Sequence, residues 1–294
     1  MNDLSHSLQQ ASPNAAATAL TQTPLLPSDG TLHAIVIELS AAQRGVFPTT
    51  LGRAIQAQVL AWLSLANPAI AQMIHDSQDN PISLSGLLGH RRSNGDIQEG
   101  DAFSIRISLL QGSLIHPLLQ GIELWGNQPL TLGKCAFVIR GVAAMPGTHG
   151  AVGSSSYELL LKTPRSQDDI TLQFQSPTSF KQEIGIQPFP LPELVFGGLL
   201  RRWNLFAGSG YQIEPIEWRA VVSAAEIKTY ALQMESSAEI GSQGWVRYRF
   251  PDASQTQIAA TLAYFSFFAG VGRKTSRGMG QTQLLQKSPI QRKR

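Results

Sequence analysis

Four glycines and three basic residues near the end of the chain form the stretch best equipped to bind a phosphate group. The glycines are Gly270, Gly272, Gly278 and Gly280, and the basic residues between them are Arg273, Lys274 and Arg277. Glycine adopts backbone conformations in which N–H groups face outward, and guanidinium and ammonium groups donate strongly to phosphate oxygens. The types and spacing of these residues therefore predict an anion-binding loop.

The order of elements around this glycine-rich loop argues against a pocket for a single nucleotide. The Walker pattern is absent, because Lys274 follows an arginine rather than a glycine. A helix is expected before the loop, and the negative end of its dipole repels phosphate. Three cations within five residues can outweigh that dipole. Such a loop suits the charged backbone of a polyanion lying across the protein surface better than a single nucleotide in a pocket. A tight connection at a domain interface is the alternative, and the residues alone leave both readings open.

Acid–base chemistry in this chain would depend on its histidines, since imidazole changes its charge near neutral pH. His90 is followed by Arg91 and Arg92, and His75 lies one position past Ile74 at the end of an expected short helix. That position is at the margin of the buried face, and a helix C-terminus favours the protonated imidazole. From position alone His75 is typical of a surface or capping residue. The remaining histidines are expected in the leader, the core or the surface: His6, His33, His116 and His149.

Two successive sets of helices and strands are expected to position these residues. The apolar run over residues 32–39 predicts a central strand, and Asn67-Pro68 has the residues that begin a new helix. The first set also has a helix ending near residue 66, strands near 82–88, 103–110 and 135–140, and a short helix at 112–119. The second set has strands at 157–161, 170–174, 216–233, 245–250 and 281–285, and helices at 191–206 and 255–268.

This order predicts an α+β fold of two tandem ferredoxin-like domains, the RRM-like β-α-β-β-α-β topology, with a C-terminal glycine-rich loop. A length of 294 residues fits two domains. The topology also occurs in proteins that lay single-stranded RNA on a sheet. The expected organisation is a disordered leader (1–30), an N-terminal domain (31–145), a Gly/Ser-rich linker (146–156), a C-terminal domain (157–286) and a basic tail (287–294).

Composition and charge narrow the class of protein. The net charge is +3, but seven basic residues and no acidic residue lie within 270–294, which indicates a polyanionic partner. No apolar run reaches the roughly 18 residues of a membrane helix, and no secretory signal precedes the first strand. The single cysteine, Cys135, excludes an internal disulfide and suits a reducing compartment. We therefore expect a cytoplasmic protein without membrane contact, and the histidine and cysteine spacing predicts neither a metal nor another cofactor.

The glycine-rich loop, together with three other segments, resembles a known family. Gly270-Val271-Gly272 and Gly278-Met279-Gly280, placed between an apolar helix and the last strand, are similar to the C-terminal loop of the RAMP superfamily. The likeness extends to the segments LVFGGLLRRWN at 194–204 and GWVRYRF at 244–250, and to Asn67-Pro68 followed by His75. Over roughly residues 31–286 the chain looks like the CRISPR-associated endoribonucleases that cut precursor RNA into guide RNAs, in particular the cyanobacterial type.

The resemblance implies metal-independent cleavage of RNA, in which a 2′-hydroxyl attacks the adjacent phosphorus and leaves a 2′,3′-cyclic phosphate and a 5′-hydroxyl. His75 occupies the position of the family's catalytic histidine, and Arg91, Arg92 or Lys274 is implied as the cation that stabilises the phosphorane. The residues implied to bind RNA are Arg201, Arg202, Gly270, Gly272, Arg273, Lys274, Arg277, Gly278 and Gly280.

One departure concerns the groups that assist the histidine. Archaeal members can add a tyrosine 15 residues before it and a lysine shortly after it. Here Leu60 stands at the first position, and no lysine lies between His75 and His90. A Tyr-His-Lys triad is therefore not carried over to this chain.

The partner that the resemblance implies is CRISPR repeat RNA within a precursor transcript. It also allows subunits of a CRISPR effector complex and a second copy of the chain as partners. Two alternatives stay open: a non-catalytic RNA-binding subunit of the same superfamily, and a nucleotide-binding or regulatory ferredoxin-like protein.

Overall fold

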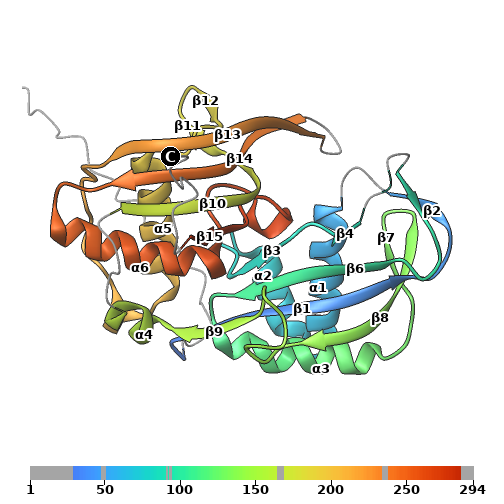
Figure 1. Ribbon diagram of the computed structural model, residues 1–294. Coiled ribbons are helices and arrows are strands. Elements are labelled where there is room, and N and C mark those ends of the chain that lie inside the picture. Colours follow the sequence, from blue (N-terminus) through green and yellow to red (C-terminus); the bar gives the residue numbers. More distant parts are fainter. Residues whose placement is uncertain are drawn as a thin grey trace, which may run out of the picture.

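The computed structural model describes residues 29–47, 51–90, 92, 95–163, 169–233 and 238–285. Its two main β-sheets lie side by side, and helices pack on each of them (Figure 1). The leader up to residue 28, Arg91 and the predicted basic tail lie outside the described residues. The α+β class is therefore confirmed.

The N-terminal sheet has the strand order β3-β6-β1-β8-β7, with β4 paired to β6 and β9 paired to β1. Its strands are β1 (Thr31–Ala41), β3 (Ile82–Leu84), β4 (Leu88–Gly89), β6 (Ala102–Leu109), β7 (Leu130–Leu132), β8 (Cys135–Ala143) and β9 (Gly153–Ser156). Helices α1 (Gly52–Ala66), α2 (Pro68–Asp76) and α3 (Ile115–Trp125, after the turn Gly112–Leu114) complete this part. A small pair, β2 (Gly45–Val46) and β5 (Asp96–Ile97), lies apart from the sheet.

The C-terminal sheet has the order β13-β14-β10-β15. Its strands are β10 (Asp169–Thr178), β13 (Val221–Gln233), β14 (Ala238–Arg249) and β15 (Thr282–Leu284). The helices are α4 (Tyr157–Lys162), α5 (Pro192–Phe206) and α6 (Ala253–Ala269), with short turns at Ser209–Tyr211 and Thr275–Arg277. A small hairpin joins β11 (Phe180–Gln182) to β12 (Gly185–Gln187).

The same connectivity occurs in both sheets. The chain runs β1-α1-β3-β6-α3-β8 in the first and β10-α5-β13-β14-α6-β15 in the second. The strands of each series also lie in the same order across their sheet. The second strand of the series is at one edge, and the third, the first and the fourth follow it. Two cores result, one centred on Trp62 of α1 and the other on Trp203 of α5, and both indoles are fully buried.

Several expected elements are confirmed. The Asn67 side chain accepts a hydrogen bond from the Ile70 N–H at 3.2 Å, so it caps α2 as predicted. The first strand, the helix at 191–206 and the apolar helix near 255–268 appear as β1, α5 and α6. Pro117 lies in the first turn of α3, where its missing N–H costs no hydrogen bond, and the helix continues beyond the predicted end to Trp125.

One predicted strand is wrong. Residues 157–161 form the helix α4, whose Ser156 cap accepts a hydrogen bond from the Leu159 N–H at 3.0 Å. Tyr157 and Leu160 are buried while Leu159 and Leu161 are exposed. The buried residues are thus spaced by three, as in a helix. A continuous apolar run in the sequence does not reveal which of its residues will be buried, so this spacing could not be predicted.

The two parts of the chain share more than a linker. Leu32 and Ala34 of β1 belong to the core of the C-terminal part, together with Leu110. Within the range predicted as a linker, β9 pairs with the start of β1. The two sheets are therefore connected by packed elements.

Candidate nucleic-acid interface and catalytic site

His75 lies on the last turn of α2, which ends at Asp76. Ala71 and Ile74 anchor the helix in the core, and the next residue, His75, is exposed. Among the described residues no group hydrogen-bonds to its imidazole. The structure therefore leaves both ring nitrogens open to a substrate.

The segment that follows α2 is fastened to α5. Arg201 Nη1 lies 3.0 Å from Asp79 Oδ1, and its side chain remains 67% exposed. Arg202 donates to the Asn80 carbonyl at 3.2 Å and to Thr275 Oγ1 at 2.5 Å. These contacts hold the residues just downstream of His75 against the second domain.

The two arginines of α5 therefore have different surroundings. Burial lowers the pKa of Arg202 to about 10, and its guanidinium is engaged inside the protein. A phosphate contact by Arg202 is not supported by this geometry, because both terminal nitrogens bind the protein and Nε is buried. Arg201 offers an exposed guanidinium to a bound anion.

The glycine-rich loop lies between the two parts of the chain. Gly270, Gly272, Gly278 and Gly280 all have positive φ, from 67° to 90°. A Cβ atom on Gly272 would collide with the Ser179 carbonyl, and one on Gly280 with the Val271 carbonyl. Gly278 pairs with Ser85, and Gly52 at the start of α1 leaves room for the Arg277 carbonyl. The glycines thus permit close packing at a domain interface. A tight connection of this kind was one of the two interpretations that the sequence left open for the loop.

Several N–H groups of the loop are used within the protein. The Arg273 N–H donates to the Ser179 carbonyl at 2.9 Å, and the Gly280 N–H to the Pro177 carbonyl at 3.0 Å. The Val271 N–H donates to the Gly280 carbonyl at 2.8 Å. The expectation of outward-facing amides therefore fails at these positions.

Glu239 of β14 holds two of the three cations of the loop. Its carboxylate accepts from Arg273 Nη1 at 2.6 Å and also binds the Lys274 ammonium. The Glu239 side chain is only 9% exposed, against 26% for Arg273 and 20% for Lys274. Arg277 has no side-chain hydrogen bond or ion pair with another described residue. The loop therefore keeps a positive balance of two charges.

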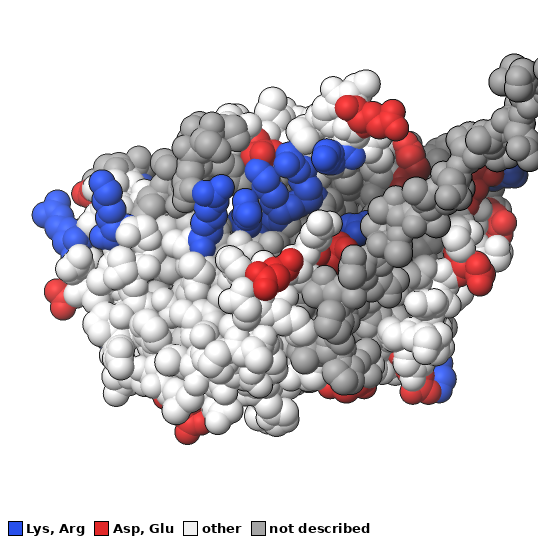
Figure 2. All heavy atoms as spheres, turned by 180° about the vertical axis from the view of Figure 1, so that it is seen from behind, with Lys and Arg blue, Asp and Glu red and all other residues white. Residues whose placement is uncertain are grey.

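Basic side chains gather on one face of the molecule. Figure 2 shows Lys and Arg in a band along the upper part of this face, with few acidic side chains among them. Such a band is the surface expected for a polyanion.

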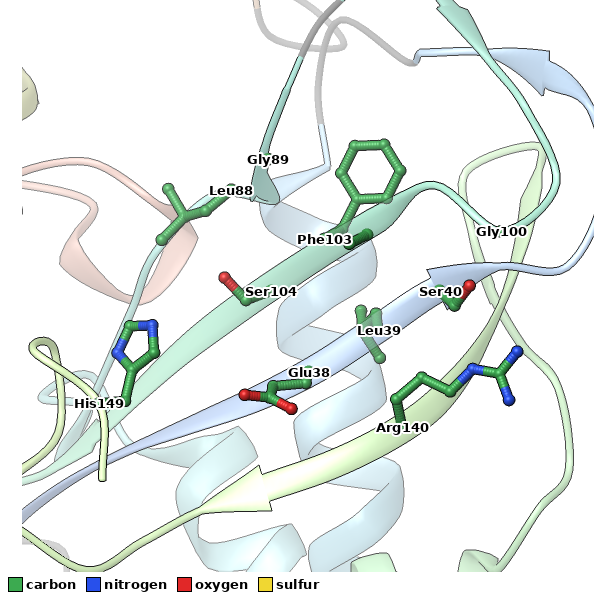
Figure 3. Close-up of a pocket in the computed structure, with 11 residues that line it drawn as sticks. Glu38, Leu39, Ser40, Leu88, Gly89, Gly100, Phe103, Ser104, Arg140 and His149 are labelled. Carbon is green, nitrogen blue, oxygen red and sulfur yellow. The ribbon is translucent and has the colours of Figure 1, made fainter.

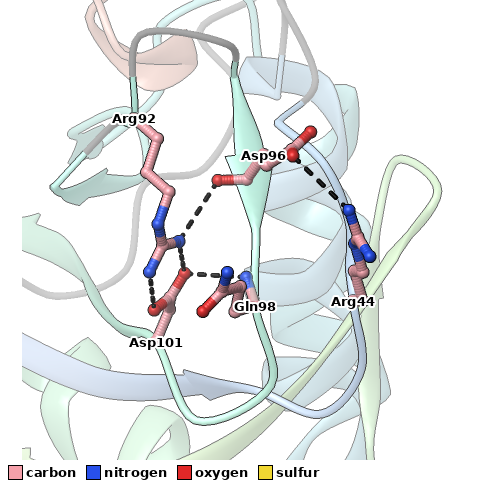
Figure 4. A network of polar contacts seen from close by, with 5 residues as sticks. All are labelled: Arg44, Arg92, Asp96, Gln98 and Asp101. Atoms are coloured by element: carbon pink, nitrogen blue, oxygen red, sulfur yellow. Dashed lines mark hydrogen bonds and ion pairs between the residues drawn. The ribbon is translucent and has the colours of Figure 1, made fainter.

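The other predicted cations lie near His90, and Arg92 is already paired. Its guanidinium binds both oxygens of Asp101, one of them at 2.9 Å (Figure 4). This hydrogen bond, helped by one from the Gln98 N–H, lowers the pKa of Asp101 to about 2. Arg44 and Asp96 form a neighbouring pair at 3.7 Å. Arg92 therefore braces this turn of the chain, whereas Arg91 lies outside the described residues.

Two structural residues escaped the sequence reasoning, Glu239 and Arg106. Arg106 donates to the carbonyls of Ala151 (2.8 Å) and Phe267 (2.6 Å) and to Gln281 Oε1 (3.0 Å). Burial lowers its pKa to about 9, so the group is still charged at neutral pH. The sequence did offer one signal for Arg106, since it is the single basic residue in the apolar strand expected at 103–110. In the structure this arginine lies at the interface between the two domains.

Within the described ranges, no cluster of three or more His, Cys, Asp or Glu side chains could hold a metal ion. No described helix has both the length and the apolar character needed to cross a membrane. Leu60, at the position of the archaeal tyrosine, packs against the N-terminal core.

Comparisons with known proteins agree with this arrangement. The model of the family described as CRISPR-associated endoribonuclease Cas6 matches residues 172–282. A Thermus thermophilus Cas6 in a product complex is 24% identical, with a TM-score of 0.71 over 87% of this chain and 100% of that one. A Cas6 in a substrate mimic complex is 26% identical (TM-score 0.63, 87% and 100%), and the product of a Cas6-related gene from Pyrococcus furiosus is 18% identical (0.60, 87% and 100%). A search of curated proteins finds no match.

The fold is thus that of an α+β protein with two sheet-bearing units, one face of which carries a band of basic side chains. Residues 172–282 match the Cas6 family model, and 87% of the chain is similar in fold to whole Cas6 endoribonuclease chains. The resemblance seen in the sequence is confirmed, although nothing in these matches supports the narrower cyanobacterial type.

Proposed function

We propose that this protein is an endoribonuclease that cuts CRISPR repeat RNA in precursor transcripts and so produces guide RNAs. The observation that carries the proposal is the exposed His75, next to a segment that Arg201 and Arg202 hold against the second domain. The family match and the RNA complexes of its relatives support the same substrate class. We also class both domains as ferredoxin-like, because each has the β-α-β-β-α-β series in the same spatial order.

The chemistry needs two proton transfers and one stabilised charge. The 2′-oxygen attacks the adjacent phosphorus as it loses its proton, and the 5′-oxygen leaves as it gains one. The products are a 2′,3′-cyclic phosphate and a 5′-hydroxyl. An imidazole has one basic nitrogen and one N–H, so His75 can perform either transfer near neutral pH.

A cation beside the phosphorane lowers the barrier by stabilising its extra negative charge. Arg201 is an exposed candidate that pairs with Asp79, four residues after His75, and Arg277 is a loop residue whose side chain has no described partner. Lys274 can contribute only in competition with Glu239. We assign Arg92 a bracing role, since Asp101 engages its guanidinium.

A second candidate function is binding of guide RNA without cleavage. It is favoured by one observation, that carboxylates already engage Arg92 and Lys274. Both functions require the basic face, and only one requires His75.

Incubation of the matching repeat RNA with the protein in EDTA distinguishes them. Cleavage with a cyclic phosphate on the upstream product is the expected result. Binding without cleavage would favour the guide-RNA holder. Cleavage that needs added divalent metal, or that leaves a 5′-phosphate, would contradict the proposed mechanism.

A further inference from the structure

The outer face of the N-terminal sheet, opposite α1 and α3, is covered only in part. Along β1 and β6 the facing pairs on this side are Ala34 with Ser108, Val36 with Arg106, and Glu38 with Ser104. Ala34 lies in the core of the C-terminal part, and the Arg106 guanidinium stacks 4.1 Å from the ring of Phe267 in α6. The C-terminal part therefore covers this face of the sheet only as far as the pair of Val36 and Arg106. From Glu38 onward the face is open.

A groove of about 510 Å³ occupies this open part of the sheet (Figure 3). It is large enough for one nucleotide, since small-ligand sites begin at about 300 Å³. Small residues form part of its lining, among them Gly89, Gly100 and Ala102. The side chains that give it chemical character are Glu38, Ser40, Leu88, Ser104, Arg140 and His149.

Two opposite charges line the groove without neutralising each other. Glu38 and Arg140 are both exposed, and neither has an ion pair or side-chain hydrogen bond with another described residue. The register between β1 and β8 shifts at Glu38 and Leu39, which leaves Arg140 as the extra residue of a β-bulge. Such bulges re-aim a side chain, and here Arg140 is among the residues that line the groove.

His149 is fixed at the other end by a chain of hydrogen bonds. The Arg106 Nε donates to the Ala151 carbonyl at 2.8 Å, and the Ala151 N–H donates to His149 Nδ1 at 3.0 Å. A neutral imidazole that accepts at Nδ1 carries its proton on Nε2. The Ala151 N–H therefore favours the tautomer with the proton on Nε2, and the buried Arg106 holds the Ala151 peptide that donates it.

We propose that this groove binds one unpaired guanine nucleotide of the RNA, a subsite that rests on the proposed function. An ionised carboxylate accepts only, and guanine alone among the bases has two adjacent donors, N1–H and the N2 amino group, on its Watson–Crick edge. Glu38 reads that edge, Leu88, which is 45% exposed, contacts the base, and Arg140 meets the phosphate. Single-stranded RNA is commonly recognised through unpaired bases on such edges.

Inosine provides the test, because it is guanosine without the N2 amino group. Binding of a short single-stranded RNA with one guanine among adenines is compared with binding of its inosine counterpart. For the wild type, inosine is expected to weaken binding by about tenfold, as for the loss of one charged hydrogen bond. Glu38→Gln should bind both RNAs equally, at the weaker level. Glu123→Gln, on the exposed side of α3, is the matched control and should keep the wild-type preference.

No preference for guanine in the wild type, or a preference that survives in Glu38→Gln, would overturn the subsite. Cleavage of repeat RNA is read separately on the same preparations. Loss of base preference with cleavage intact supports the subsite, whereas absence of cleavage with the preference intact counts only against the nuclease. The short RNA contains no repeat, so the two failures are distinguishable.

Discussion

Arg201 and Arg202 are neighbours on α5 with different roles. Arg201 keeps most of its side chain in solvent while it pairs with Asp79, and Arg202 crosses the domain interface to the Asn80 carbonyl and Thr275. Adjacent helical positions point about 100° apart, which allows one basic pair to face both solvent and interior. We therefore expect one arginine to matter for RNA and the other for folding.

Replacement of Arg202 by alanine should lower the free energy of unfolding by about 2–4 kcal/mol, because it leaves a cavity and unpaired polar groups. Arg201→Ala should change it by no more than about 1 kcal/mol, as is typical of an exposed ion pair. Urea titration of both variants measures the difference. Equal losses in the two would contradict the division of roles.

The Arg92–Asp101 pair makes stability depend on acid pH. The Arg92 hydrogen bond, with help from the Gln98 N–H, lowers the pKa of Asp101 from 3.8 to about 2. The unfolded chain therefore takes up this proton at a higher pH than the folded chain. The stabilisation is complete above pH 3.8 and is lost as the pH falls through 2.

In Asp101→Asn this pH-dependent contribution is absent. The variant should be less stable than the wild type above the unfolded-state pKa, and the two unfolding curves should converge as the pH falls toward 2. Asp76→Asn, at an exposed carboxyl without a described ion pair, is the control. A gap that stays constant with pH would show that the pair does not form in solution.

The glycine-rich loop connects α6 to β15 and also packs against β3 and the start of α1. Its positive φ angles and close carbonyl contacts explain why glycine is needed at Gly272 and Gly280. Where a loop amide binds within the protein, we expect a side chain rather than the amide to meet the proposed RNA. The loop thus joins the two domains and presents Arg277 beside them.

Gly280→Ala should destabilise the protein by about 2–4 kcal/mol, because alanine is strained at positive φ and its Cβ would meet the Val271 carbonyl. Gly198→Ala is the matched control. That glycine lies within α5 with nothing near its missing Cβ, so alanine should stabilise by about 0.5–1 kcal/mol. Thermal unfolding of both variants should therefore move in opposite directions.

The sequence predicted most elements because periodicity and caps are local signals. Asn67 and Pro68 predict the start of a helix from their own chemistry, and the apolar run of β1 predicts a buried strand in the same way. It failed at 157–161, where burial spacing distinguishes helix from strand only once the packing partners are known. The ion pairs of Glu239 and Arg92 escaped for a similar reason, since each joins residues whose proximity depends on the fold. The placement of His75 came from the family resemblance rather than from spacing.

At the scale of the whole molecule, one face carries a band of Lys and Arg side chains (Figure 2). Glu239 reduces this charge, since it pairs with both Arg273 and Lys274 from a nearly buried position. Phosphates that approach the loop must therefore compete with one carboxylate. If the loop binds RNA as proposed, we expect the stability of the interface and the strength of RNA binding to be linked.

Glu239→Gln should strengthen RNA binding at low salt and weaken folding. Up to one additional phosphate contact would steepen the plot of log affinity against log salt by about 0.7–0.9. The loss of the shared carboxylate should cost about 1–3 kcal/mol of stability. Filter binding at several salt concentrations, with Glu226→Gln on exposed β13 as the control, measures the slope. An unchanged slope would show that the loop cations do not meet phosphate.

The most direct measurement is cleavage of repeat RNA in EDTA by the wild type, His75→Ala and His90→Ala, with binding measured on the same samples. Both histidines are exposed, so neither replacement should unfold the protein. We expect the wild type and His90→Ala to cut, and His75→Ala to bind with similar affinity but lose at least about 100-fold in rate, the usual contribution of a positioned acid or base. Undiminished cleavage by His75→Ala would contradict the central role of this residue.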